Sequence, residues 1–131
     1  MEGRDYARVL LKKAAQDEFV MLKLMECAES PDEAIGFHAQ QAVEKSMKAV
    51  LSSRGVRFRK THDLTELVDL LRDSGVTFPG ELDDVTRLTP FATFFRYEDL
   101  WADPEGRLDR AWMTDCVRKT MAWAEVAVGQ E

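Results

Sequence analysis

A stripe of small side chains between residues 32 and 54 constrains the fold more than any other feature of the sequence. Ala39, Ala42, Ser46, Ala49 and Ser53 recur every three or four residues, which places them on one face of an α-helix. Small side chains on a helix face allow a neighbouring helix to approach closely. The sequence therefore predicts a long helix packed tightly inside a helical bundle.

Four further segments have helical patterns, and no segment has the alternation typical of a strand. They cover residues 4–29, residues 61–75, a stretch after Pro79 that Pro90 interrupts, and residues 105–128. Gly55 and Gly75 are placed to end the second and third helices as left-handed caps. We expect an all-α fold, an up-and-down antiparallel helical bundle of about four long helices plus one short helix. The whole chain, residues 1–131, is expected to form this single domain.

Composition excludes several classes of protein. The chain has 131 residues and a formal net charge of −6, which argues against a protein that coats nucleic acid through bulk positive charge. No apolar run approaches the roughly 20 residues of a membrane span, and the N-terminal residues lack the plan of a signal peptide. Cys27 and Cys116 lie within helical patterns, without the spacing of a metal site. A reducing cytoplasm is the expected location.

The stretch "RGVRFRKTHD", residues 54–63, holds the densest cluster of positive charge. Arg57 and His62 have the spacing Arg-x4-His, which can supply acid–base chemistry and a cation to a phosphodiester. Arg59 and Lys60 could hold flanking phosphates. In the alternative reading, His62 caps or stacks on the start of the next helix, and the solvated cations complement the end of the preceding one.

A polar face lies on the other side of the small-residue helix. His38, Gln41, Lys45 and Lys48 share it, and they could bind a nucleotide phosphate or the carboxylates of a partner. Alternatively, His38 is a hydrogen-bonded histidine at the edge of the core, and the lysines pair with Glu44 or its neighbours at helical spacing.

Arg96 and Tyr97 follow an aromatic run and form a third candidate anion site. Arg96 is suited to bind a phosphate or carboxylate in a fork, or to form a structural ion pair with Glu98, Asp99 or Asp17. The acidic residues have no partner ligands at metal-binding spacing, so we predict neither a metal nor another cofactor.

Three quoted segments resemble HEPN domains (higher eukaryote and prokaryote nucleotide-binding helical domains). They are "GFHAQQAVEKSMKAVLSSRG", "THDLTELVDLL" and "LTPFATFFRYED", and the likeness extends over essentially the whole chain. The resemblance implies a helical bundle, often a homodimer, and frequently a small nucleotidyltransferase as the other half of a two-protein, toxin–antitoxin-like module. Several branches of the family are metal-independent endoribonucleases.

The sequence departs from those nucleases in one respect. Their Arg-x4–6-His motif lies on a late helix, whereas the two histidines of this chain are His38 and His62, and no histidine follows Arg96. We therefore expect a dimerising module that binds a nucleotide or another anion and has a nucleotidyltransferase partner. The alternatives are a metal-independent endoribonuclease that uses an Arg/His pair, and a helical oligomerisation module without chemistry.

Overall fold

The computed structural model describes residues 2–93 and 109–129. Their elements are α1 (Glu2–Met25), α2 (Asp32–Ser53), α3 (Leu64–Asp73), the 3-10 helix η1 (Gly80–Thr93) and α4 (Arg110–Gly129). No strand occurs in these two ranges, and the prediction of an all-α helical bundle is confirmed. Helices α1, α2 and α4 are long, α3 is short, and the fourth segment is a 3-10 helix rather than an α-helix.

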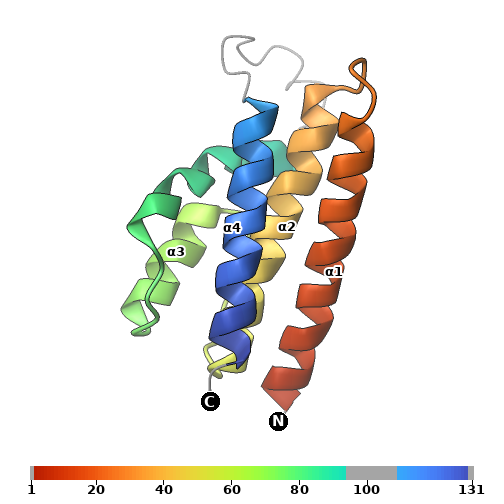
Figure 1. Cartoon of the computed structure of the whole chain (residues 1–131). Coiled ribbons are helices and arrows are strands. Elements are labelled where there is room, and N and C mark those ends of the chain that lie inside the picture. Colours follow the sequence, from red (N-terminus) through yellow and green to blue (C-terminus); the bar gives the residue numbers. More distant parts are fainter. Residues whose placement is uncertain (1, 94–108, 130–131) are drawn as a thin grey trace.

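Helix α2 lies at the centre and contacts all four other elements. Figure 1 shows α1 running antiparallel to α2, whereas α2 and α4 run in the same direction. Two contacts fix that parallel pair: Arg110 at the start of α4 bonds to Asp32 at the start of α2, and Arg54 just beyond α2 bonds to the carbonyl of Ala127. The α3–η1 pair lies to one side and returns the chain to the end of the bundle where α4 begins.

The small-residue stripe of α2 is buried as predicted except at its last position, Ser53, which is partly exposed. Ala39, Ala42, Ser46 and Ala49 are fully inaccessible to solvent. Helix α1 contributes small buried residues of its own, Ala7 and Ala14. A Cβ atom at Gly3 would overlap the carbonyl oxygen of Ser52, so the two helices approach closely at this end, and a larger side chain at this position would push them apart.

The η1 segment has a burial period of three residues. Leu82, Val85, Leu88 and Phe91 are all buried. A 3-10 helix has three residues per turn, so this spacing places all four side chains on one face. Pro90 lies inside η1 and does not interrupt it, contrary to the expectation from the sequence.

The turns around α3 follow the predicted chemistry. Gly55 and Gly75 adopt φ angles of +70° and +82°, so both are left-handed caps, as expected. Asp63 is the N-cap of α3, and its carboxylate accepts a hydrogen bond from the Thr65 amide at 3.0 Å. The start of α3, and with it the position of His62, is therefore fixed by local capping. None of the described helices is both long enough and apolar enough to cross a bilayer.

Candidate functional site

Two carboxylate clusters lie along the polar side of α2. The first, called here the Asp17 cluster, joins α1 to α2. Asp17 is buried and forms a 3.0 Å bond with Nδ1 of His38, and Lys45 donates to its other carboxylate oxygen. His38 also packs edge-on against Phe37. The buried position of Asp17 on α1 is thus explained by its pairing with His38 and Lys45 across the interface of α1 and α2.

The second, the Glu44 cluster, joins α2 to the loop before α3. The side chain of Glu44 is only 5% exposed. Its Oε1 accepts from Nδ1 of His62 at 2.8 Å and from Nε2 of Gln40 at 2.9 Å, and its Oε2 accepts from Lys48 at 2.9 Å. Gln40 also donates to the backbone carbonyl of His62 at 3.2 Å. Both the ring and the backbone of His62 are therefore held by groups on α2.

The Glu44 carboxylate is charged in this environment. Burial by itself raises the pKa of Glu44, but the hydrogen bonds from Gln40, Lys48 and His62 outweigh it, so that the pKa lies below the ordinary value. With neutral imidazole, the charges of Glu44 and Lys48 cancel. A proton on His62 would give the cluster a net charge of +1.

The orientation of His62 determines what its ring can do. Its Nδ1 faces the Glu44 carboxylate, which selects the tautomer with hydrogen on Nδ1. The side chain is 62% exposed, and Nε2 has no protein partner among the described residues. A neutral ring can accept a proton at Nε2, and a protonated ring can donate a hydrogen bond from Nε2 to an anion.

The cations of the loop divide into two kinds. Arg59 forms a bidentate pair with Glu66, with bonds of 2.8 and 2.7 Å, and this pairing holds the pKa of the Glu66 carboxyl below its ordinary value. Arg57 and Lys60 are exposed and make no hydrogen bond or ion pair within residues 2–93 and 109–129. The charge of Arg59 is thus already paired, whereas those of Arg57 and Lys60 face solvent.

The structure brings some of the predicted residues together and separates others. Gln41 donates to the side chain of Gln40 at 2.7 Å, which links the polar face of α2 to the His62 loop. His38, by contrast, belongs to the Asp17 cluster. No hydrogen bond joins Arg57 to His62 in the described structure, although the two share the loop.

Lys45 and Lys48 each bind a buried carboxylate, in agreement with the structural reading of the lysines. Arg96 and Tyr97 lie outside the described residues.

Sequence reasoning missed Gln40 as a functional residue and treated Glu44 only as a partner for lysines. Both side chains are buried, and they lie one helical turn apart on α2. A signal was present: Gln40 directly follows Ala39, on the buried side of the helix. A polar residue there requires a hydrogen-bond partner inside the protein, and Glu44 at four residues' distance provides one.

The buried Cys116 offers little chemistry in this arrangement. Burial raises the pKa of Cys116 to about 12, with a further contribution from the nearby Asp115 charge, so its thiol stays protonated at neutral pH. Within the part of the chain that the structure covers, no group of three or more histidine, cysteine or acidic side chains could hold a metal ion.

Comparison with known proteins identifies the family of this helical domain. One relative is the protein named "Putative toxin MJ1304" from Methanocaldococcus jannaschii, which is 40% identical over 55 residues. The matched segment is 42% of this chain and covers 35% of that relative's length. No solved structure matches the chain. The family model described as "HEPN domain" matches residues 7–126, nearly the whole sequence. The chain therefore belongs to the HEPN domain family.

Proposed function

We propose that this HEPN domain binds a nucleotide or a related phosphate-bearing anion at the loop between α2 and α3. The observation that carries the proposal is the anchoring of His62: its Nδ1 is bound to the buried Glu44 carboxylate, so that Nε2 is directed away from that carboxylate. An exposed ring held in this way needs little reorganisation to meet a ligand.

The local charge supports an anionic ligand. Arg57 and Lys60 lie in the same loop as His62 and keep their charges unpaired among the described residues, while Glu44 is neutralised by Lys48. Fields between exposed charges fade over about 8–10 Å at physiological salt. The ligand therefore experiences this cationic loop rather than the net charge of the whole chain, which is −6.

The wider setting of the proposal is a two-protein module. We infer a cytoplasmic homodimer that acts with a small nucleotidyltransferase, as the toxin-like half of a toxin–antitoxin pair. The supports are the family match and the name of the M. jannaschii relative, of which this chain covers 35%. Light scattering would give a homodimer a molar mass twice that of the single chain, which is 15.0 kDa. Co-expression with a nucleotidyltransferase encoded beside its gene would test the partner.

Calorimetric titration with adenine and guanine nucleotides tests the binding site. We expect His62→Asn and the double substitution Arg57→Gln/Lys60→Gln to weaken binding about 10-fold or more. The first removes the hydrogen bond that a protonated His62 donates from Nε2 to phosphate, and the second removes two cationic donors. Lys12→Gln is the matched control, since it removes an exposed lysine from α1. Absence of binding at millimolar nucleotide, or equal weakening by the control, would reject the loop as the site.

One observation favours a second function, metal-independent RNA cleavage. A histidine whose Nδ1 is bound to a carboxylate can take a proton from a ribose 2′-hydroxyl through Nε2, and Arg57 could stabilise the developing phosphorane charge. This function predicts that RNA is cut in the presence of a chelator and that His62→Asn abolishes the cutting. Intact RNA together with absent nucleotide binding would leave the third reading, a helical oligomerisation module.

A further inference from the structure

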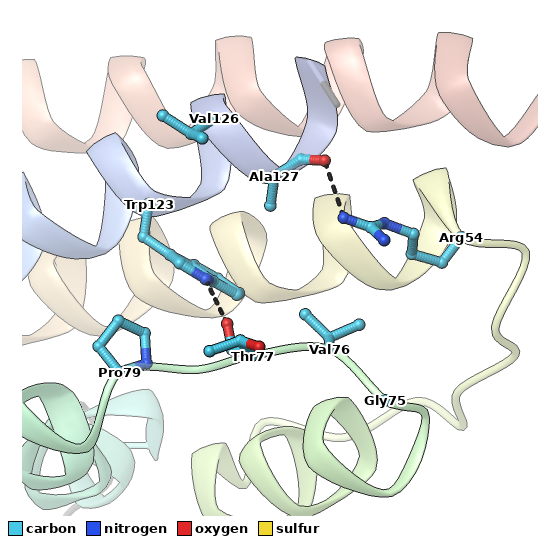
Figure 2. A pocket seen from close by; sticks show the side chains of 8 residues that line it. All are labelled: Arg54, Gly75, Val76, Thr77, Pro79, Trp123, Val126 and Ala127. Atoms are coloured by element: carbon cyan, nitrogen blue, oxygen red, sulfur yellow. Dashed lines mark hydrogen bonds between the residues drawn. The ribbon is translucent and has the colours of Figure 1, made fainter. Parts of the chain in front are cut away.

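A cavity of about 310 Å³ opens beside the end of α4, and no residue of the Glu44 cluster lines it. It lies between the end of α4, the residue that follows α2, and the loop that joins α3 to η1 (Figure 2). Its lining residues are Arg54, Gly75, Val76, Thr77, Pro79, Trp123, Val126 and Ala127. The volume is at the lower limit of pockets that hold small organic molecules.

Arg54 is the charged residue of this lining. It follows the last residue of α2, and its guanidinium reaches across to α4, where Nη2 donates to the carbonyl of Ala127 at 3.1 Å. This bond fixes the side chain against the cavity (Figure 2). A guanidinium has five N–H donors, and the other donors of Arg54 have no partner among the described residues. The cavity thus presents a positioned cation, and none of the described residues that line it is a carboxylate.

The opposite wall is apolar and equally fixed. The indole N–H of Trp123 donates to the carbonyl of Thr77 at 2.9 Å, and the ring packs edge-on against Phe78 with the centroids 4.9 Å apart. The polar atom of the indole is therefore occupied, and the remaining ring surface offers an apolar aromatic face to a ligand. Val126 lines the same cavity although its side chain is largely exposed. A bound apolar group would cover it.

One effect opposes an anion here. Helices α2 and α4 both end beside the cavity, and helix C-termini carry partial negative charge. Several of these carbonyls already accept hydrogen bonds: Ala127 from Arg54, and Val50, Leu51 and Ser52 from backbone amides. An anion paired with Arg54 meets the guanidinium charge at hydrogen-bonding distance, whereas the partial negative charge is spread over the carbonyls of two helix ends. A phosphate dianion would find no second cation among the described lining residues.

We propose that this cavity binds a small organic carboxylate with a planar apolar body. The carboxylate pairs with the free donors of Arg54 in the fork geometry that guanidinium favours. The apolar body lies against Trp123, Val76 and Val126. Arg54 begins the loop that carries His62, but Arg57, Lys60 and His62 do not line this cavity, so the proposal stands independently of the proposed function.

The test uses two probes of nearly the same shape, the anion 1-naphthoate and the neutral 1-naphthamide, with the full chain labelled with ¹⁵N. The readout is the indole N–H resonance of Trp123, assigned by its loss in Trp123→Phe. We expect a saturable shift with naphthoate and a dissociation constant of about 1 mM or below, which is ordinary for a ligand of this size. We expect naphthamide to bind at least about 10-fold more weakly.

Variants separate this site from nonspecific attraction. Arg54→Gln is expected to weaken naphthoate about 10-fold and to leave naphthamide unchanged, and Arg54→Lys, which keeps the charge but not the fork, should fall between. Arg57→Gln removes a loop cation three residues away and should change neither affinity. The proposal is overturned if naphthoate gives no saturable shift up to 10 mM, if the amide binds as tightly, or if Arg57→Gln causes the same loss. Nucleotide binding by Arg54→Gln shows separately whether the His62 loop is intact.

Discussion

Substitution of Glu44 by glutamine tests the Glu44 cluster most directly. The change keeps the size of the side chain and removes its charge. Lys48, whose side chain is only 13% exposed, would then hold its ammonium charge without a counter-charge. Removal of one member of a buried ion pair costs about 3–5 kcal/mol. Because glutamine still offers an acceptor, we expect the lower limit, a loss of about 3 kcal/mol in the free energy of unfolding.

Urea denaturation followed by circular dichroism measures this loss. With a slope of about 2 kcal/mol per molar urea, the midpoint should fall by about 1.5 M. The double substitution Glu44→Gln/Lys48→Met removes both charges, so its loss should be at least about 1.5 kcal/mol smaller than the sum of the two single losses. Glu26→Gln is the matched control. It breaks an exposed pair with Lys23, for which we expect a loss of less than about 0.5 kcal/mol.

A loss of under about 1 kcal/mol for Glu44→Gln would refute the reasoning, since it would mean that water already reaches Lys48. Additivity of the two single substitutions would also contradict it, because the pair would then not act as a unit. High salt distinguishes the exposed pair from the buried pair, because it screens exposed charges more strongly. It should reduce the loss in the free energy of unfolding caused by Glu26→Gln and leave the loss caused by Glu44→Gln nearly unchanged.

Three further outcomes are expected. The lowered pKa of Glu44 means that its contribution to stability is present above the ordinary value of 4.5 and is lost as pH falls through the native value, so acid unfolding curves should become flatter in Glu44→Gln. Gly36→Ala would place a Cβ atom into the Phe91 ring; it should destabilise by about 1–3 kcal/mol, and a Phe91→Ala background should abolish that loss. Native Cys116, with its pKa raised to about 12 by burial, should resist iodoacetamide at pH 8 while exposed Cys27 reacts, as mass spectrometry can show.

Short-range rules in the sequence predicted much of the fold. The stripe from Ala39 to Ala49 indicated the central helix, and Gly55 and Gly75 marked the ends of α2 and α3 because only glycine adopts positive φ without strain. The three-residue spacing from Leu82 to Phe91 was also visible. This spacing by itself does not indicate a 3-10 helix, because 3-10 helices of this length are uncommon.

The candidate site was less predictable, because its bonds join residues far apart in the chain. Glu44 and His62 are 18 residues apart, and Asp17 and Lys45 are 28 apart. Helical spacing identified only the pair of Glu44 with Lys48. Whether Arg59 is free or paired also depended on the position of Glu66 across the loop.

The sequence by itself determined which segments become helices, which face of α2 is buried, and to which family the chain belongs, since periodicity, caps and a long motif are properties of neighbouring residues. Only the tertiary structure decided which charges are paired. A carboxylate inside the bundle stays ionised only where donors surround it, and those donors arrive on separate segments. The same packing anchored His62 on Glu44 and placed Arg54 beside the Trp123 cavity.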